Sequence, residues 1–236
     1  MAAETRVWLI TGTSSGIGLA TIKEVLAAGE RVAAVTRKAS SLAPLVAVHP
    51  PEDLLVLEFD VGNPNAAVKP LFQSVLAHFG RVDVVVNNAG YGLNGVVEGT
   101  TDEQAREQVE VNFWGPVRIS REAVRVFREN NIGGRILNIS SIGGFLSNPT
   151  LAFYSASKFA LEGFSEGLHK ELDPTWNIKV ITIQLGGART EWGKSNFREL
   201  PLPLAYNDPE GIPNRMRILI KDNTPISDPV KGLYFH

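Results

Sequence analysis

The chain has 236 residues, of which 44% are hydrophobic and 20% charged, and its formal net charge is −2. This length and composition indicate a single domain with one sizeable core. The balanced charge, without a basic run, argues against nucleic acid and membrane surfaces as partners. The absence of cysteine excludes disulfides and thiol nucleophiles and is typical of a cytoplasmic protein. The four histidines lack metal-ligand spacing, and we expect no metal, signal peptide or membrane span.

Short apolar runs alternate with longer amphipathic segments along most of the chain. The runs predict strands at residues 7–11, 31–36, 54–59, 82–87, 135–140 and 179–185. The longer segments predict helices at 17–28, 66–79, 101–130 and 152–172, the third opening with a capping box of Thr101 and Gln104. This order predicts an α/β fold, a doubly wound parallel sheet of the Rossmann type in a single domain. Ligands of such sheets bind at the carboxyl ends of the strands.

The composition changes near residue 190. We expect residues 1–190 to form the dinucleotide-binding catalytic part, whereas residues 191–236 are rich in proline and polar residues. Only residues 216–221 in this tail predict a short regular element. We expect the tail to pack over the active site as a lid of the same domain, and a disordered tail is the alternative.

A glycine-rich turn lies between the first predicted strand and helix. Glycine permits a tight turn and a close backbone approach, and the following helix N-terminus attracts a pyrophosphate. The predicted cofactor-binding residues of this turn are Gly12, Ser14, Ser15, Gly16, Ile17 and Gly18. The glycine spacing differs from the usual G-x-G-x-x-G, and an ordinary glycine-rich loop is the alternative reading.

The end of the second strand points to the form of the dinucleotide. NAD enzymes of this architecture place an acidic residue there to bind the ribose hydroxyls. This chain has Arg37 and Lys38 instead, and no Asp or Glu occurs between Arg31 and Pro51. Because arginine can bind a 2′-phosphate, the sequence predicts NADP(H); the alternative is that both cations are merely solvated.

Two further strand ends supply candidate cofactor contacts. Asp60 and Val61, at the end of the third strand, are candidate cofactor-binding residues, and Asp60 is a candidate for binding adenine. Asn88, Ala89 and Gly90 follow the fourth strand and are candidates for lining the cofactor groove. Both positions are equally compatible with turn-forming residues.

The candidate catalytic residues lie further along the chain. Tyr154 and Lys158 are four residues apart and so share one helix face. A neighbouring ammonium favours the phenolate, so we expect Lys158 to lower the pKa of Tyr154 toward the range of a general acid or base. Ser141, at the end of a strand, lies 13 positions before Tyr154, with Ser140 beside it. Its hydroxyl can hydrogen-bond a carbonyl oxygen that receives the proton of Tyr154.

Asn112 lies in a predicted helix, four residues before Pro116. Proline has no N–H, so the carbonyl of Asn112 loses its usual helical donor. We expect that carbonyl to bind a water or to accompany a helix kink; a plain proline kink is the alternative.

These motifs, in their order and spacing, resemble the short-chain dehydrogenase/reductase superfamily over nearly the whole chain to Thr190. The resemblance implies a catalytic tetrad of Asn112, Ser141, Tyr154 and Lys158. It implies that Tyr154 is the acid/base, that Ser141 contacts the oxyanion and that Lys158 binds the nicotinamide ribose. The Asn112 carbonyl would then hold a relay water. Arg37 would bind phosphate, Thr190 would bind the nicotinamide amide, and Gly186 would contact the cofactor.

Two features depart from the family pattern. Leu185 stands where the family usually has proline, and residues 231–236 show neither the further helix nor the seventh strand with which members usually continue. The resemblance also implies a homodimer or homotetramer formed through the helices that carry Asn112 and Tyr154.

The function predicted is NADP(H)-dependent hydride transfer between nicotinamide and a carbonyl or secondary alcohol of an apolar small molecule. A non-catalytic cofactor-sensing or scaffold protein is the alternative, and so is an epimerase or dehydratase of the same superfamily. A cofactor sensor needs the glycine turn but no proton relay, so the complete tetrad favours an enzyme.

Overall fold

The computed structural model describes residues 5–186 and 196–222. Its centre is a parallel sheet of six strands in the order β3-β2-β1-β4-β6-β7. The strands are β1 Val7–Thr11, β2 Arg31–Thr36, β3 Leu54–Glu58, β4 Val84–Asn87, β6 Gly134–Ser141 and β7 Ile178–Leu185. The chain proceeds outward from the β1–β4 pair to both edges, as in a doubly wound sheet. The predicted fold class is confirmed, and a ligand crevice belongs at the carboxyl ends of β1 and β4.

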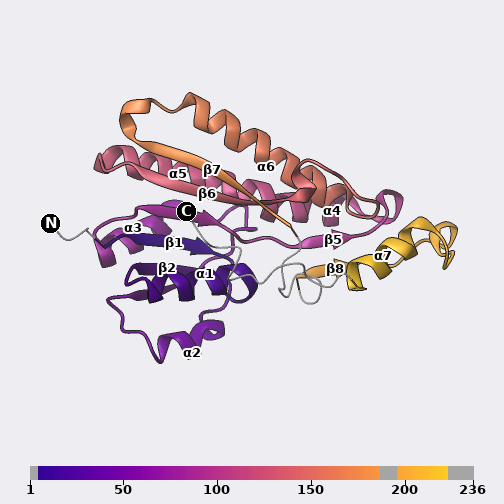
Figure 1. Ribbon diagram of the computed structural model, residues 1–236, viewed down its shortest axis with the longest axis horizontal. Coiled ribbons are helices and arrows are strands. Elements are labelled where there is room, and N and C mark those ends of the chain that lie inside the picture. Colours follow the sequence, from indigo (N-terminus) through magenta and orange to yellow (C-terminus); the bar gives the residue numbers. More distant parts are fainter. Residues whose placement is uncertain (1–4, 187–195, 223–236) are drawn as a thin grey trace.

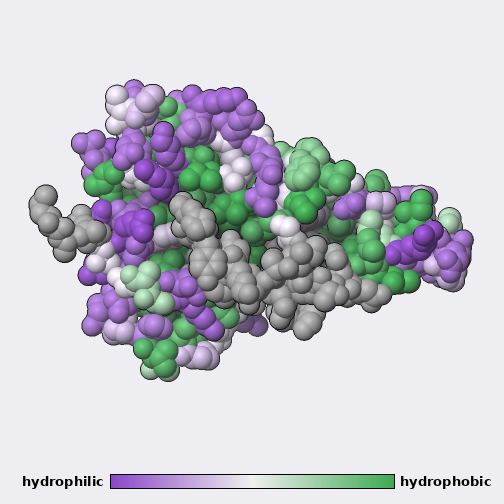
Figure 2. All heavy atoms as spheres, in the orientation of Figure 1, coloured by the Kyte–Doolittle hydropathy of each residue, from purple (hydrophilic) through white to green (hydrophobic). Residues whose placement is uncertain are grey.

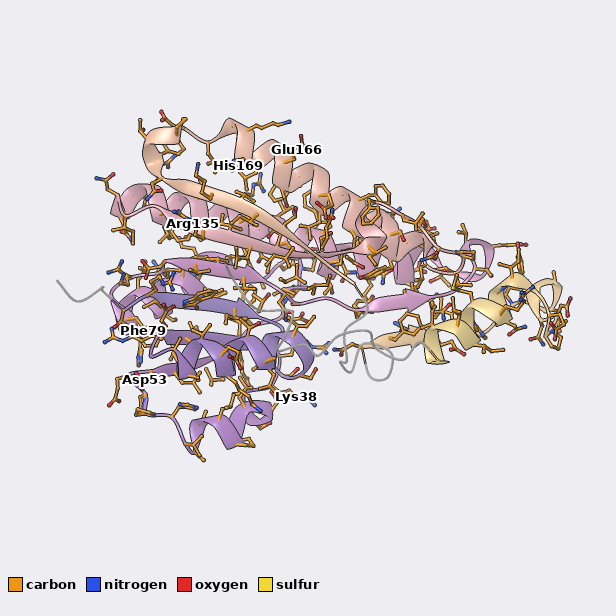
Figure 3. All side chains as sticks on the ribbon, viewed as in Figure 1. Lys38, Asp53, Phe79, Arg135, Glu166 and His169 are labelled. Carbon is orange, nitrogen blue, oxygen red and sulfur yellow. The ribbon has the colours of Figure 1, made fainter. Side chains whose placement is uncertain are left out.

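Helices cover both faces of this sheet (Figure 1). They are α1 Gly16–Ala27, α2 Ala43–Val46, α3 Val68–Phe79, α5 Gly115–Asn130 and α6 Ala152–Glu171. Val7 and Leu9 of β1 share a core with side chains of α3, α5 and α6, whereas Trp8 and Ile10 share a second core with α1. Successive strand residues point to opposite faces, so a strand between two helix layers must be apolar throughout. Side chains fill the space between the layers (Figure 3).

The predicted helix 101–130 is interrupted. It comprises α4 Asp102–Val109, a π-helical turn Glu110–Trp114, and α5. The capping box of α4 is confirmed, because the N–H of Gln104 donates to Thr101 Oγ1 at 3.3 Å and the N–H of Thr101 donates to Gln104 Oε1 at 3.0 Å. In the π turn, the N–H of Gly115 bonds the carbonyl of Glu110, five residues earlier. The π turn contains Asn112 and ends two residues before Pro116, which has no N–H to donate to the carbonyl of Asn112.

The end of the described chain forms a small second sheet and an arm. β5 Gly92–Asn94 pairs in parallel with β8 Phe197–Glu199. Helix α7 Ile212–Asp222, longer than the predicted 216–221, projects beyond them (Figure 1). Hydrophobic atoms are visible on this arm (Figure 2), where Ile212, Ile218 and Leu219 are exposed. The predicted lid includes residues 191–195 and 223–236, which lie outside the described residues.

The described residues show neither a membrane-spanning helix nor a cluster of metal ligands. No helix among them is long and apolar enough to cross a membrane. Within the same ranges, no group of three or more His, Cys, Asp or Glu side chains is placed to hold a metal ion.

Candidate active site

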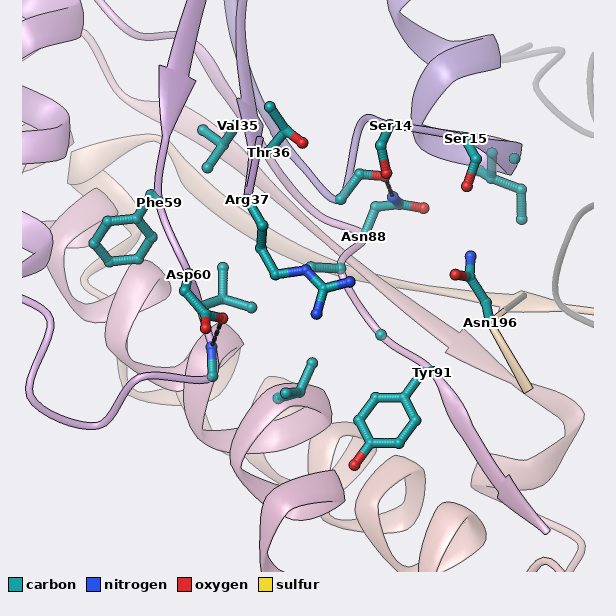
Figure 4. A pocket seen from close by; sticks show the side chains of 18 of the residues that line it. Ser14, Ser15, Val35, Thr36, Arg37, Phe59, Asp60, Asn88, Tyr91 and Asn196 are labelled. Atoms are coloured by element: carbon teal, nitrogen blue, oxygen red, sulfur yellow. Dashed lines mark hydrogen bonds between the residues drawn. The ribbon is translucent and has the colours of Figure 1, made fainter. Parts of the chain in front are cut away.

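A cleft of about 590 Å³ lies at the carboxyl end of the sheet (Figure 4). It brings together most of the predicted cofactor-binding and catalytic residues: Gly12, Ser14, Ser15, Gly16, Ile17, Arg37, Asp60, Val61, Asn88, Ala89, Gly90, Tyr154 and Lys158. Among the described residues, Gly18, Asn112, Ser141 and Gly186 are predicted site residues that do not line it. Thr190 lies outside the described residues.

The glycine turn requires glycine for two different reasons. Gly12 has φ +67°, and a Cβ there would lie 2.6 Å from the Cα of Ala89. Gly18 does not face the cleft; a Cβ on it would lie 2.4 Å from the carbonyl oxygen of Gly12. Gly12 therefore allows the turn to approach the end of β4, and Gly18 allows helix α1 to pack beneath the turn.

Asn88 ties the glycine turn to the end of β4. Its Nδ2 donates to the carbonyl oxygens of Thr11 at 2.8 Å and Gly12 at 3.0 Å. Thr11 Oγ1 in turn accepts the backbone N–H groups of Asn88 and Ala89. The side chain of Asn88 therefore holds the glycine turn in place. Thr11 supports the same turn through its hydroxyl, a role that was not predicted from the sequence.

The first turn of α1 is suited to an anion. Ser15 is the N-cap residue but its side chain makes no capping hydrogen bond, and no acidic residue lies in the first turn. The free N–H groups of a helix N-terminus, together with its dipole, bind phosphate groups. With the close-packed glycines, these residues fit the diphosphate of a dinucleotide.

Arg37 and Asp60 lie at the end of the cleft formed by β2 and β3. The guanidinium of Arg37 extends into the cleft (Figure 4). Within the part of the chain that the structure describes, it makes no ion pair. Asp60 Oδ1 accepts the N–H of Gly62 at 2.9 Å, which is the turn-forming role considered as the alternative. Val61 is buried, and its carbonyl oxygen accepts a hydrogen bond from Arg118 Nη2 at 2.7 Å.

Tyr154 and Lys158 lie on α6, and each residue is only 6% exposed although both line the cleft. Lys158 Nζ donates to the carbonyl oxygen of Ile139 in β6 at 2.8 Å. The same nitrogen lies 6.0 Å from the centroid of the Tyr154 ring. The helix thus presents the phenol and the ammonium together, as their spacing predicts.

The net pKa direction predicted for Tyr154 is wrong for this structure. Burial raises the pKa of the Tyr154 phenol, and its hydrogen bond with Ser141 only partly opposes that rise. Burial likewise lowers the pKa of Lys158 to about 8, against the opposing charge of Glu162. Both shifts have one cause, since removal from water penalises the phenolate and the ammonium alike.

The two serines at the end of β6 have different surroundings. Ser141 Oγ accepts the N–H of Gly143 at 3.1 Å and is hydrogen-bonded with Tyr154. Ser140 Oγ is buried and has no hydrogen-bond partner among the described residues, and a Cβ added to Gly144 would lie 2.7 Å from it. Gly143 is a further functional position, because a Cβ there would lie 2.9 Å from Cε1 of Tyr154.

These surroundings predict unequal effects of the two serine substitutions. Loss of an oxyanion contact typically lowers kcat by about 10²–10³-fold, and we expect Ser141→Ala to fall in that range. Ser140→Ala removes a hydroxyl without a partner and should change kcat by less than about threefold. Steady-state kinetics of both variants check this; equal losses would contradict the assignment of Ser141.

The side chain of Asn112 joins the cofactor loop to the catalytic helix. Its Oδ1 accepts the N–H of Tyr91 at 3.1 Å, and its Nδ2 donates to the carbonyl oxygen of Tyr91 at 3.0 Å. Nδ2 also lies 3.2 Å from Ser157 Oγ, which donates to the carbonyl oxygen of Tyr154 at 2.6 Å. The sequence predicts a role only for the backbone carbonyl of Asn112, and the relay water on that carbonyl stays a prediction.

Tyr91 and Gln108 are additional site residues. Tyr91 lines the cleft, and Gln108 Nε2 donates to its carbonyl oxygen at 3.0 Å. Gly90 packs closely against Asn112, because a Cβ there would lie 3.1 Å from Asn112 Oδ1. The sequence points to Tyr91 only through its position directly after the Asn87–Gly90 run. Gln108 is buried but lies in a polar segment, so nothing in the sequence marks it as a site residue.

Comparison with known proteins gives the family. Residues 6–200 match the family model described as short chain dehydrogenase. An uncharacterized oxidoreductase of Schizosaccharomyces pombe is 44% identical over 201 residues, which are 85% of this chain and 67% of that protein. The 3-ketodihydrosphingosine reductase of Bacteroides thetaiotaomicron is 38% identical over 185 residues, 78% of this chain and 65% of that protein. The chain thus spans about two thirds of the length of these curated relatives.

Solved structures agree with this match. A short-chain dehydrogenase from Streptomyces avermitilis has a TM-score of 0.87 at 37% identity, with 98% of this chain and 82% of that chain covered. A gluconate 5-dehydrogenase from Burkholderia cenocepacia, in complex with NADP and tartrate, has a TM-score of 0.73 at 26% identity, with 80% and 74% covered. A Burkholderia phymatum protein in complex with NAD shares the fold at 22% identity, with a TM-score of 0.82 and 98% and 84% covered. The chain therefore belongs to the short-chain dehydrogenase/reductase family.

Proposed function

We propose that the protein is an NADP(H)-dependent oxidoreductase that transfers a hydride between nicotinamide and a carbonyl or secondary alcohol of an apolar small molecule. The observation that carries this proposal is the placement of Tyr154 and Lys158 in the cleft that begins at the glycine turn. The relatives named oxidoreductase support it, as does the keto-group reductase among them.

The residues of the site have distinct roles in this reaction. The bound nicotinamide supplies the hydride chemistry. Burial keeps Tyr154 protonated, so its hydroxyl is placed to give a proton to the substrate oxygen during reduction. Ser141 fixes that hydroxyl and shares the substrate oxygen with it. Lys158 holds the ribose with its ammonium, and Asn112 keeps the loop at Tyr91 and helix α6 in register.

An apolar substrate is supported by the segment that follows Ser141. Ile142, Phe145 and Leu146 are large hydrophobic residues with exposed side chains next to the catalytic serine. Exposed apolar groups beside a polar site are typical of a surface that a ligand covers. The activity is tested by following NADPH absorbance with a panel of apolar ketones and aldehydes. Failure of every carbonyl compound would contradict the proposal.

The preference for NADP(H) rests on Arg37. We expect NADPH to bind more tightly than NADH, and the double variant Thr36→Asp with Arg37→Ala to reverse the order. A charge-assisted hydrogen bond contributes about 1.5–3 kcal/mol, so the loss of NADPH affinity should be about tenfold or more. Fluorescence titration of both cofactors measures it. A wild-type protein that binds NADH at least as tightly would show the assignment to be wrong.

Assembly and location complete the proposal. We propose a cytoplasmic homodimer or homotetramer. Trp114 on the π turn and Phe159 on α6 are large hydrophobic side chains that are exposed in the single chain, which supports a subunit interface at these helices. The cytoplasmic location rests on the absence of cysteine.

A further inference from the structure

Strand β8 brings a distant part of the chain to the cofactor loop. The N–H of Gly92 donates to the carbonyl oxygen of Asn196 at 2.9 Å, and the N–H of Leu200 donates to the carbonyl oxygen of Asn94 at 2.9 Å. β5 follows the Asn88–Gly90 loop after only Tyr91. The backbone of β8 is thus fixed against the segment that directly follows the Asn88–Gly90 loop.

The alternation of a strand directs two side chains of this segment into the cleft. Asn196 and Arg198 are two residues apart, so they share a face, and both line the cleft. Glu199 lies instead beside Arg217 of α7, with 3.6 Å between Oε1 and Nη1. Figure 4 shows the Asn196 amide on the opposite side of the cleft from Arg37, facing the end that carries Ser15. No part of the predicted cofactor motif includes either residue.

Arg198 is held by a weak contact. Its Nη1 donates to Oε2 of Glu107 on α4 at 3.1 Å, and both side chains are more than half exposed. An ion pair in solvent contributes little, so the guanidinium can turn to another anion at small cost. The charges of Glu107 and Arg198 also act on the hydroxyl of Tyr91, which is buried and has no hydrogen-bond partner among the described residues.

The cleft is also suited to an anion that spans its width. The lining includes three cations, Arg37, Lys158 and Arg198, and two acids, Asp60 and Glu107. Asp60 bonds the N–H of Gly62, whereas Glu107 has Arg198 as its partner. A guanidinium binds phosphate oxygens with several parallel hydrogen bonds, and an amide can donate to the same group.

We propose that β8 forms the outer wall of the dinucleotide site and that Asn196 and Arg198 bind the phosphate groups of the cofactor. This inference rests on the proposed function, because it requires a dinucleotide in the cleft. It adds a binding surface opposite the glycine turn, supplied by a part of the chain more than 100 residues after β5.

The test is a calorimetric titration of the full chain with NAD⁺ and, separately, with NADP⁺. Arg198→Ala should weaken binding by about tenfold or more, and Asn196→Ala by about threefold. A loss for both cofactors assigns Arg198 to the diphosphate, and a loss for NADP⁺ alone assigns it to the 2′-phosphate. The pairing of β5 and β8 uses backbone groups only, so both variants should keep the fold.

Two controls separate binding from structure. Glu107→Gln removes the same ion pair but keeps the cation, so it should bind both cofactors at least as tightly as the wild type. Arg106→Ala removes an exposed cation of α4 that does not line the cleft, so it should leave the affinity for both cofactors unchanged. The inference is overturned if Arg198→Ala binds like the wild type, or if Glu107→Gln weakens binding equally. A wild-type protein that binds neither cofactor would instead contradict the proposed function itself.

Discussion

Tyr154→Phe is expected to lower kcat by about 10²–10⁴-fold, the usual contribution of a positioned general acid. The substitution removes only the hydroxyl, which is hydrogen-bonded with Ser141. The ring that packs against Gly143 and lies near Lys158 is retained. The fold and the affinity for NADPH should therefore stay close to those of the wild type. Steady-state kinetics, together with a fluorescence titration of NADPH, measure the two quantities separately.

A matched variant guards against a purely structural explanation. Tyr91→Phe also removes a buried hydroxyl from the cleft, but this hydroxyl has no partner among the described residues. We expect it to keep most of its activity. Near-normal turnover of Tyr154→Phe would refute the proposed proton transfer, and equal losses in both variants would show that the effect is not specific to Tyr154.

Lys158→Ala is expected to lower both kcat and the affinity for NADPH, because one ammonium is assigned to the ribose and to the proton path. The change also leaves a cavity and removes the donor to the carbonyl oxygen of Ile139. Lys158→Met keeps most of the side-chain length, so it removes the charge and the hydrogen bond to Ile139 without leaving a large cavity. If Lys158→Met binds NADPH as the wild type does, the ammonium does not hold the cofactor.

The shifted pKa of Lys158 should make cofactor affinity and the free energy of unfolding depend on pH. Burial lowers that pKa from 10.5 to about 8, so the folded protein loses the ammonium as the pH rises through about 8. The affinity of the free enzyme for NADPH should therefore fall above about pH 8. The unfolded chain keeps this proton up to about 10.5, so Lys158 should make the free energy of unfolding rise between these pH values. Lys158→Met should lack both effects.

The inner strands β1, β2, β4 and β6 could be predicted because nearly all of their residues are buried, on both faces of the sheet. Their side chains are therefore mostly apolar, and β1 and β2 have the bounds that the sequence predicts. Other strand ends differ from the predicted ones by one or two residues. β3 ends at Glu58 instead of residue 59, and β4 begins at Val84 instead of residue 82. The glycine turn and the Tyr154–Lys158 pair were equally visible, since local spacing fixes which face of an element carries them.

Features that depend on tertiary contacts were not predictable in the same way. β5 and β8 have three residues each, too few for a periodic pattern, and they pair across a large gap in sequence. The π turn requires an extra residue in one turn of the helix. Pro116 predicts only that the helix is kinked there, not that it contains a π turn. The pKa of Tyr154 depends on its burial beneath several segments, so the neighbouring Lys158 alone gave the wrong direction.

The most direct test of the central claim is hydride transfer itself. NADPH carrying deuterium at both C4 positions of the dihydronicotinamide is incubated with the wild-type protein and an apolar ketone that the panel identifies as a substrate, and the product alcohol is analysed by mass spectrometry. The account predicts one deuterium on the carbinol carbon, and almost none when Tyr154→Phe replaces the wild type under the same conditions. Product alcohol without deuterium, or equal labelling by the Tyr154→Phe variant, would contradict it.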